Sequence, residues 1–156
     1  MDIIAEGLRH FTGTHRRFEY KGKLGGITIV DDYAHHPDEI RATLAAARRC
    51  DSKRIVCVFQ PHTYTRTKAL MDEFVDALSL ADRVVLAKIY AARETDTLGV
   101  SSGDLCKKLK AKGVDAWYFS TFDEIETFLL ENSIDGDLLI TMGAGDVVLV
   151  GEALIK

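Results

Sequence analysis

The feature that most constrains this chain is a regular alternation of short apolar runs with segments of helical periodicity. The alternating or continuous apolar runs predict strands, and the first two, which flank a glycine-rich turn at residues 21–26, predict an antiparallel hairpin. The expected strands are residues 17–20, 27–30, 55–59, 84–87, 116–119 and 138–141. Helical patterns lie between and after them at residues 38–49, 67–80, 102–111, 121–131 and 146–155. This order predicts an α/β fold: a Rossmann-like, doubly wound, mostly parallel six-stranded sheet with an N-terminal antiparallel hairpin and helices on both faces.

Length and charge narrow the class of protein. The 156 residues suit one domain, and 20 basic against 24 acidic residues give a net charge of −4. This balance offers no bulk attraction for nucleic acid or an anionic membrane, so we expect neither as a partner. The three cysteines form no C-x-x-C pair, and no apolar run approaches ~18–20 residues. We therefore expect a cytoplasmic domain.

Polar residues gather where the second and third strands end. In doubly wound sheets, ligands bind beyond the carboxyl ends of the strands. Residues 31–37 place two aspartates, a tyrosine and two histidines directly after one strand. Such polar density indicates a binding site. The structural alternative is that His36 caps the helix that follows and that one aspartate closes the turn, with Pro37 at the first helical position.

The next strand is followed by residues 60–67, which present His62 and Arg66 beside a helix start. Arginine is a planar, permanent cation that suits a carboxylate or a phosphate. A capping loop with one solvated arginine is the alternative. Paired Arg16 and Arg17 precede the first strand, and they could reach a phosphate or lie at a solvated edge.

Two other strand ends give weaker signals. Residues 88–99 form a long loop after the fourth strand, and loops of this length are often functional. This loop carries Tyr90, Arg93, Glu94 and Asp96, whose roles the sequence leaves open. After the last strand, Gly143 and Gly145 could expose backbone N–H groups to an anion, although a plain tight turn explains them equally well.

A metal site and a serine hydrolase site are both disfavoured. His35 and His36 are adjacent on a turn, whereas zinc ligands on one element are usually spaced by two to four positions. We therefore expect no protein-bound metal in this chain. No G-x-S-x-G motif occurs, so the sequence lacks the nucleophile turn of the α/β-hydrolases.

Four motifs in order, HRRFE, DDYAHHPDEI, FQPHTYTRT and MGAGD, resemble the C-terminal domain of the Mur ligases of peptidoglycan synthesis. The resemblance covers essentially the whole chain and favours the alanine-adding branch. The muropeptide-recycling branch is similar at the second motif but tends to have Phe in place of Tyr33, and it lacks QPHTYTRT. The resemblance implies that ATP phosphorylates the carboxyl of UDP-N-acetylmuramate and that the amine of L-alanine attacks the acyl phosphate.

The resemblance also implies residue roles. Arg17 is expected to reach the ATP phosphates, Asp32 the ATP ribose, and His35 the nucleotide. The expected lining of the alanine and acyl-phosphate pocket is Tyr33, His36, His62 and Arg66, with Gly143 and Gly145 beside it. Tyr33 is also expected near the nucleotide, and Arg17, His36 and His62 are expected to serve catalysis. Some relatives have Arg in place of Thr63, which leaves the alanine contacts open.

The same resemblance predicts that other domains are needed. Residues 1–10 are expected to be the end of a central domain plus a linker, and residues 11–156 the C-terminal domain. The sequence contains no G-x-x-x-x-G-K-[ST], so we expect the ATP loop and the Mg²⁺ ligands in the missing central domain, and the sugar site in the missing N-terminal domain. The domain alone is then expected to be inactive. The alternatives are the recycling ligase or a stand-alone nucleotide- or amino-acid-binding module.

Overall fold

The computed structural model describes residues 17–156, in which six strands form one mixed sheet. Their spatial order is β1-β2-β6-β3-β4-β5. The strands are β1 (Glu19–Leu24), β2 (Ile27–Asp32), β3 (Arg54–Phe59), β4 (Arg83–Leu86), β5 (Asp115–Tyr118) and β6 (Asp137–Met142). Within residues 17–156, only the β1–β2 pair is antiparallel, so the predicted fold class is confirmed. The linker expected at residues 1–10 lies outside the described residues, as does Arg16.

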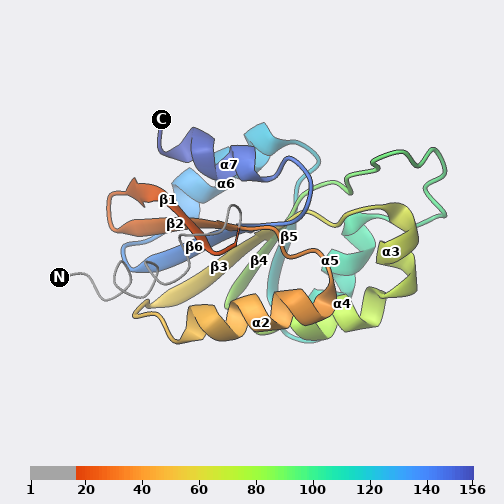
Figure 1. The fold of residues 1–156 in the computed structure, drawn as a ribbon, viewed down its shortest axis with the longest axis horizontal. Coiled ribbons are helices and arrows are strands. Elements are labelled where there is room, and N and C mark those ends of the chain that lie inside the picture. The colour runs from red at the N-terminus through yellow and green to blue at the C-terminus, as the bar shows by residue number, and fades with distance from the viewer. Residues whose placement is uncertain (1–16) are drawn as a thin grey trace.

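Helices cover both faces of the sheet. The helices are α2 (Pro37–Arg48), α3 (Tyr64–Ala69), α4 (Met71–Leu78), α5 (Ser102–Ala111), α6 (Phe122–Asn132) and α7 (Val148–Leu154). Figure 1 shows α6 and α7 above the sheet and α2, α4 and α5 below it. None of the helices in residues 17–156 has the length and apolar character needed to cross a bilayer.

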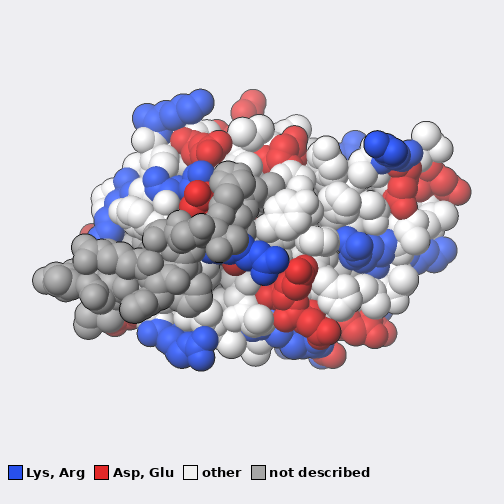
Figure 2. Space-filling model, viewed as in Figure 1, with Lys and Arg blue, Asp and Glu red and all other residues white. Residues whose placement is uncertain are grey.

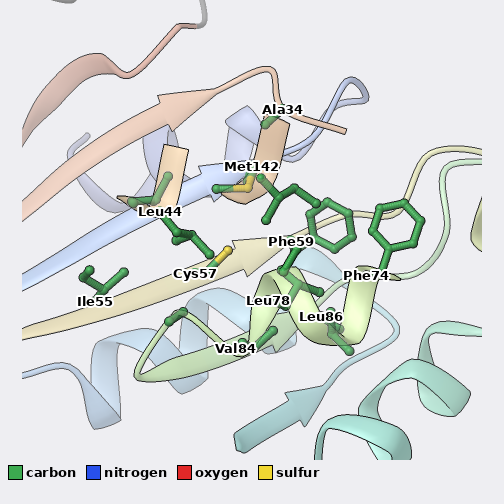
Figure 3. Packing of buried hydrophobic residues seen from close by; sticks show 14 of the residues in the cluster. Ala34, Leu44, Ile55, Cys57, Phe59, Phe74, Leu78, Val84, Leu86 and Met142 are labelled. Carbon is green, nitrogen blue, oxygen red and sulfur yellow. The ribbon is translucent and has the colours of Figure 1, made fainter. Parts of the chain in front are cut away.

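The two-residue period of the strands divides the buried side chains between these two layers. Along β3, Cys57 and Phe59 face α2 and α4, whereas Val56 and Val58 face α6 and α7. Figure 3 shows the first layer, where Phe59 and Phe74 lie together with ring centroids 5.6 Å apart. Burial of this apolar surface on both sides of the sheet is the main force that holds the strands in register.

The hairpin differs from its prediction. Its turn comprises only Gly25 and Gly26, so β1 runs on to Leu24 instead of ending at Tyr20. Gly22 lies at an irregularity where the pairing register of β1 shifts. The glycine-rich sequence therefore combines a bulge with a turn, and Gly25, at φ 58°, occupies the left-handed region that favours glycine.

The single helix predicted at residues 67–80 is wrong, because the structure divides it into α3 and α4. Leu70 leaves the helical region at φ −115°, and its N–H donates to the carbonyl of Arg66. The carbonyl of Leu70 then accepts from Phe74 N–H in the first turn of α4. The apolar period continues across the break, since it records which side chains are buried and not whether the backbone is continuous.

Strand β5 also departs from the expectation that the later strands are buried on both faces. It forms one edge of the sheet, and Trp117 is 40% exposed beside the ring of Phe128.

On the surface shown in Figure 2, basic and acidic side chains are intermixed. Among the described residues, this face carries no large patch of one charge, so any attraction for a charged ligand at the strand ends must come from individual side chains.

Candidate functional site

Three neighbouring parallel strands end at the same level, which brings their following loops together. Met142 of β6 pairs with Asp32 of β2 on one side and with Phe59 of β3 on the other. Backbone bonds continue past the strands, from Gly143 N–H to Asp32 O at 3.1 Å and from Gln60 N–H to Met142 O at 3.0 Å. The polar residues predicted at separate strand ends thus share one edge of the sheet.

Asp32 lies at the base of a pocket of about 300 Å³. The pocket is lined by Arg17, Asp32, Tyr33, Ala34, Asp38, Glu39, Ala42 and Thr43. The structure therefore brings together three of the residues expected near ATP: Arg17, Asp32 and Tyr33. His35, expected near the nucleotide, and His62 and Arg66, expected near L-alanine, are not part of this lining.

The carboxylate of Asp32 is also a structural acceptor. It is 6% exposed, and it accepts from Phe18 N–H at 2.9 Å and from Ala34 N–H at 2.8 Å. Burial raises the pKa of Asp32 above its usual value, and the bonds from these two amides and from Thr43 oppose that rise. Phe18 has a φ of 48°, so Asp32 binds a turn held in an unfavourable backbone conformation directly after Arg17.

The two adjacent histidines have different partners. His36 caps α2, because its Nδ1 accepts from Asp38 N–H at 3.2 Å, and Glu39 completes a capping box. The structural alternative for His36 is thus present, with the ring exposed to solvent. His35 Nδ1 lies 3.0 Å from the carbonyl of Tyr33, which can only accept, so this nitrogen carries the proton. Its Nε2 is then left for another partner.

His62 lies between His35, which follows β2, and Tyr90, which follows β4. Its ring centroid lies 5.8 Å from that of His35 and 5.5 Å from that of Tyr90, which stacks on it. Burial, followed by the nearby His35 and Arg66, lowers the pKa of His62 below its usual value. This shift favours the neutral imidazole, which is the form that can accept a proton.

Two buried polar atoms at this point have no hydrogen-bond partner within the described part of the chain: Nδ1 of His62 and Nη1 of Arg66. Buried polar groups are normally paired, so this unpaired ring nitrogen and this unpaired guanidinium donor are candidates for binding a polar ligand. A guanidinium N–H in this position suits a carboxylate.

The loop between β4 and α5, green in Figure 1, packs against the His62 segment. Thr63 N–H donates to Tyr90 O at 2.8 Å, and Tyr90 N–H donates to Pro61 O at 2.9 Å. The carboxylate of Glu94 accepts from the amides of Tyr64 and Thr65. Sequence reasoning gave Tyr90 and Glu94 no role, because their partners lie about 30 positions away and only the fold brings them together.

The glycine turn after β6 is closely packed. A β-carbon at Gly145 would lie 2.6 Å from Oε1 of Gln60 and 2.8 Å from the ring of Tyr90, so no larger residue fits unless these side chains move. At Gly143 a β-carbon would lie 2.8 Å from the carbonyl of Gln60, and φ is 146°. Close approach thus explains both glycines.

Gln60 is a residue that sequence reasoning missed. Its side chain donates to Asp146 Oδ1 at 3.1 Å and accepts from Val147 N–H at 3.2 Å, which joins the ends of β3 and β6. Its only signal in the sequence was a glutamine directly after a buried strand. A neighbouring pocket of about 420 Å³ is lined by Gln60, Tyr64, Lys88, Ile89, Tyr90, Ala91, Ser120, Phe122 and Asp146.

The fold and the candidate site define a doubly wound α/β domain with polar residues gathered at the carboxyl edge of the sheet. The chain belongs to the family described as "Mur ligase, glutamate ligase domain", whose pattern matches residues 16–145. It is 63% identical over 156 residues to the UDP-N-acetylmuramate–L-alanine ligase of Lachnospira eligens, and this match covers 100% of the chain and 34% of the relative. The chain thus spans about a third of the length of the curated relatives it matches.

Solved structures agree with this assignment. The UDP-N-acetylmuramate–alanine ligase of Thermotoga maritima superposes with a TM-score of 0.75 at 30% identity, over 96% of this chain and 31% of that one. A murein peptide ligase of Psychrobacter arcticus superposes with a TM-score of 0.72 at 21% identity, over 90% of this chain and 29% of that one. At that lower identity, the second likeness shows the fold alone.

Proposed function

We propose that residues 11–156 form the C-terminal domain of an ATP-dependent ligase that joins L-alanine to UDP-N-acetylmuramate in the cytoplasm. The high identity to the Lachnospira eligens ligase supports this substrate pair over that of the recycling branch. In the proposed reaction, the γ-phosphoryl group of ATP passes to the muramate carboxylate. The alanine amine then attacks the acyl phosphate, and phosphate leaves from the tetrahedral intermediate.

The pocket around Asp32 is the proposed nucleotide part of the site. Arg17 lies on its rim, exposed, where a guanidinium could stabilise negative charge on the transferring phosphoryl group. Asp32 and Tyr33 line the same pocket, and His35 lies two positions after Tyr33. In our proposal, Asp32 binds the ribose while it also holds the Phe18 turn that presents Arg17.

The unpaired atoms of His62 and Arg66 are the observation that supports an amino-acid pocket. Arg66 would bind the carboxylate of L-alanine, and neutral His62 would accept a proton from its ammonium group so that the amine can attack. His36 caps α2 through Nδ1. In our proposal its other ring nitrogen, Nε2, binds the acyl phosphate. In our proposal the turn at Gly143 and Gly145 lies beside this pocket, because Gly145 packs closely against Tyr90, which stacks on His62.

Magnesium does not fit the residues described here. Among residues 17–156, no group of three or more His, Cys, Asp or Glu side chains is arranged to hold a metal ion. We therefore assign the Mg²⁺ ligands, the ATP loop and the sugar site to the domains of the ligase that lie outside this chain. Those domains are its proposed partners.

The test uses the complete ligase and measures phosphate release that depends on both L-alanine and UDP-N-acetylmuramate. Arg66→Lys is expected to raise the KM for alanine, because a point charge replaces a bidentate donor, while the KM for ATP stays the same. Arg17→Ala is expected to raise the KM for ATP or to abolish turnover. Unchanged kinetics in either variant would remove that residue from the proposed site, and a complete enzyme inactive with alanine would refute the function.

Calorimetry on this chain separates the ligase domain from a stand-alone binding module. A domain that supplies one wall of a site closed by other domains is expected to bind ATP or L-alanine weakly or not at all. Tight binding of either by residues 1–156 alone would favour the module.

A further inference from the structure

The strongest unassigned feature outside the proposed binding residues is the contact between Glu94 and the start of α3. The carboxylate accepts from Tyr64 N–H, from Thr65 N–H at 3.2 Å and from the Thr65 hydroxyl. Glu94 comes from the β4–α5 loop, about 30 positions further along the chain. It therefore connects the β4–α5 loop to the start of α3, the helix that carries Arg66.

The loop holds Glu94 in this orientation by its own turn. Ala92 has a φ of 57°, and Glu94 N–H donates to Ala91 O at 3.0 Å. Lys68 on α3 donates to the carbonyl of Leu98 at 3.2 Å, which adds a second connection between the helix and the loop. The long loop is thus ordered against α3 at both of these points.

The segment that Glu94 contacts begins next to a residue with a strained backbone. Thr63 is β-branched, yet it has a φ of 67°, where such side chains are strained. Thr63 already caps α3 through its hydroxyl, which accepts from Arg66 N–H. Glu94 accepts from the two preceding amides of this helix start, Tyr64 N–H and Thr65 N–H, and because it comes from a different loop its bonds also hold the strained segment between His62 and Arg66 in place.

We propose that Glu94 is a positioning residue that sets the geometry of His62 and Arg66 for the amino-acid substrate. This inference rests on the proposed function, since it names a residue that acts through that site. The negative charge of Glu94 also lies close enough to His62 to oppose the lowering of its pKa by burial. The carboxylate thus acts on both the position and the charge of the groups that face the ligand.

The first test is kinetic, in the complete ligase. Glu94→Ala is expected to raise the KM for L-alanine on the order of ten- to a hundredfold, because a small displacement of binding groups has effects of this size. Glu94→Gln keeps one carbonyl acceptor, so it is expected to fall between the wild type and Glu94→Ala. The KM for ATP should stay within about twofold in both variants, since a displacement confined to α3 leaves the Asp32 pocket unchanged.

The control is Asp104→Asn, which weakens the bond from Ser101 N–H to a carboxylate at the start of a different helix, α5. It is expected to leave both KM values unchanged. Wild-type alanine kinetics in Glu94→Ala, or equal effects in Asp104→Asn, would overturn the proposal.

The second test does not depend on activity. In NMR spectra of this chain, Glu94→Gln is expected to speed hydrogen exchange at Tyr64 and Thr65 and to lower the pKa of His62 further. Inactivity of the wild-type ligase with alanine would refute the proposed function but leave this test readable. Unchanged exchange and an unchanged His62 titration would overturn the role of Glu94 in either case.

Discussion

Replacing Asp32 by alanine in this chain tests how the strand end is held. The substitution removes the acceptor of two buried amides, Phe18 N–H and Ala34 N–H, and also a bond from Thr43. A buried donor left without a partner costs about 1–3 kcal/mol. The two amides together therefore cost roughly 2–6 kcal/mol, and relief from burying a carboxylate offsets part of that sum.

We expect a net loss of about 3 kcal/mol in the free energy of unfolding, which corresponds to a fall in Tm of roughly 6–12 °C for a domain of this size. Asp32→Asn keeps one carbonyl acceptor and is expected to lose about half as much. The assay is thermal and urea unfolding followed by circular dichroism. Asp38→Ala is the matched control, because this acidic side chain is 82% exposed in the first turn of α2.

The pH dependence of the same variants gives a second measurement. Because the folded chain raises the pKa of Asp32, it binds a proton more readily than the unfolded chain does. This group therefore stabilises the fold increasingly as pH falls from neutral through the raised pKa towards the usual value of 3.8, and the contribution is absent in Asp32→Asn. A wild-type Tm in Asp32→Ala, or the same pH slope in Asp32→Asn, would refute the reasoning. The stability loss also makes Asp32→Asn the better variant for ATP kinetics.

Three further outcomes are expected. Burial raises the pKa of the Cys57 thiol to about 12. A thiol reagent at pH 8 should therefore label half-buried Cys50 and leave Cys57 unlabelled until the chain unfolds. Fast labelling of Cys57 in the folded chain would contradict this. The pKa of His62 measured by NMR should lie below 6.5. The contribution of neutral His62 to the free energy of unfolding should then be lost as the pH falls below 6.5 through the lowered pKa. A pKa at or above 6.5 would show that burial does not set the pKa of this ring. Gly145→Ala should cost about 1–3 kcal/mol and displace Tyr90 from His62, and an unchanged Tm and ring spectrum would show that the turn has room for a side chain.

The fold could be predicted from the sequence because its signals are local. The two-residue and 3.6-residue periods located all six strands and most helices, and Pro37 with its acidic neighbours located the start of α2. The break at Leu70 was missed because the burial period continues through it. The turn at Gly25 was predicted too long because a glycine at a bulge and a glycine in a turn look the same in sequence.

The site divides in the same way. Its polar residues were predicted because they stand directly after buried strands, where the fold class places ligands. Gln60, Tyr90 and Glu94 were not assigned roles, since each acts on a segment distant in sequence. The cap formed by His36 was left open, because one imidazole can cap a helix or face a substrate.

By itself, the sequence determined the doubly wound sheet, the strand ends that carry the candidate site, and the family through its four motifs. These properties depend on periodicity and on residue types within a few positions of each other. Only the tertiary structure decided that both carboxylate oxygens of Asp32 accept from backbone amides, that burial lowers the pKa of His62, and that Glu94 binds the start of α3. Each of these depends on burial and on contacts between segments far apart in the chain, which exist only after the strands have assembled.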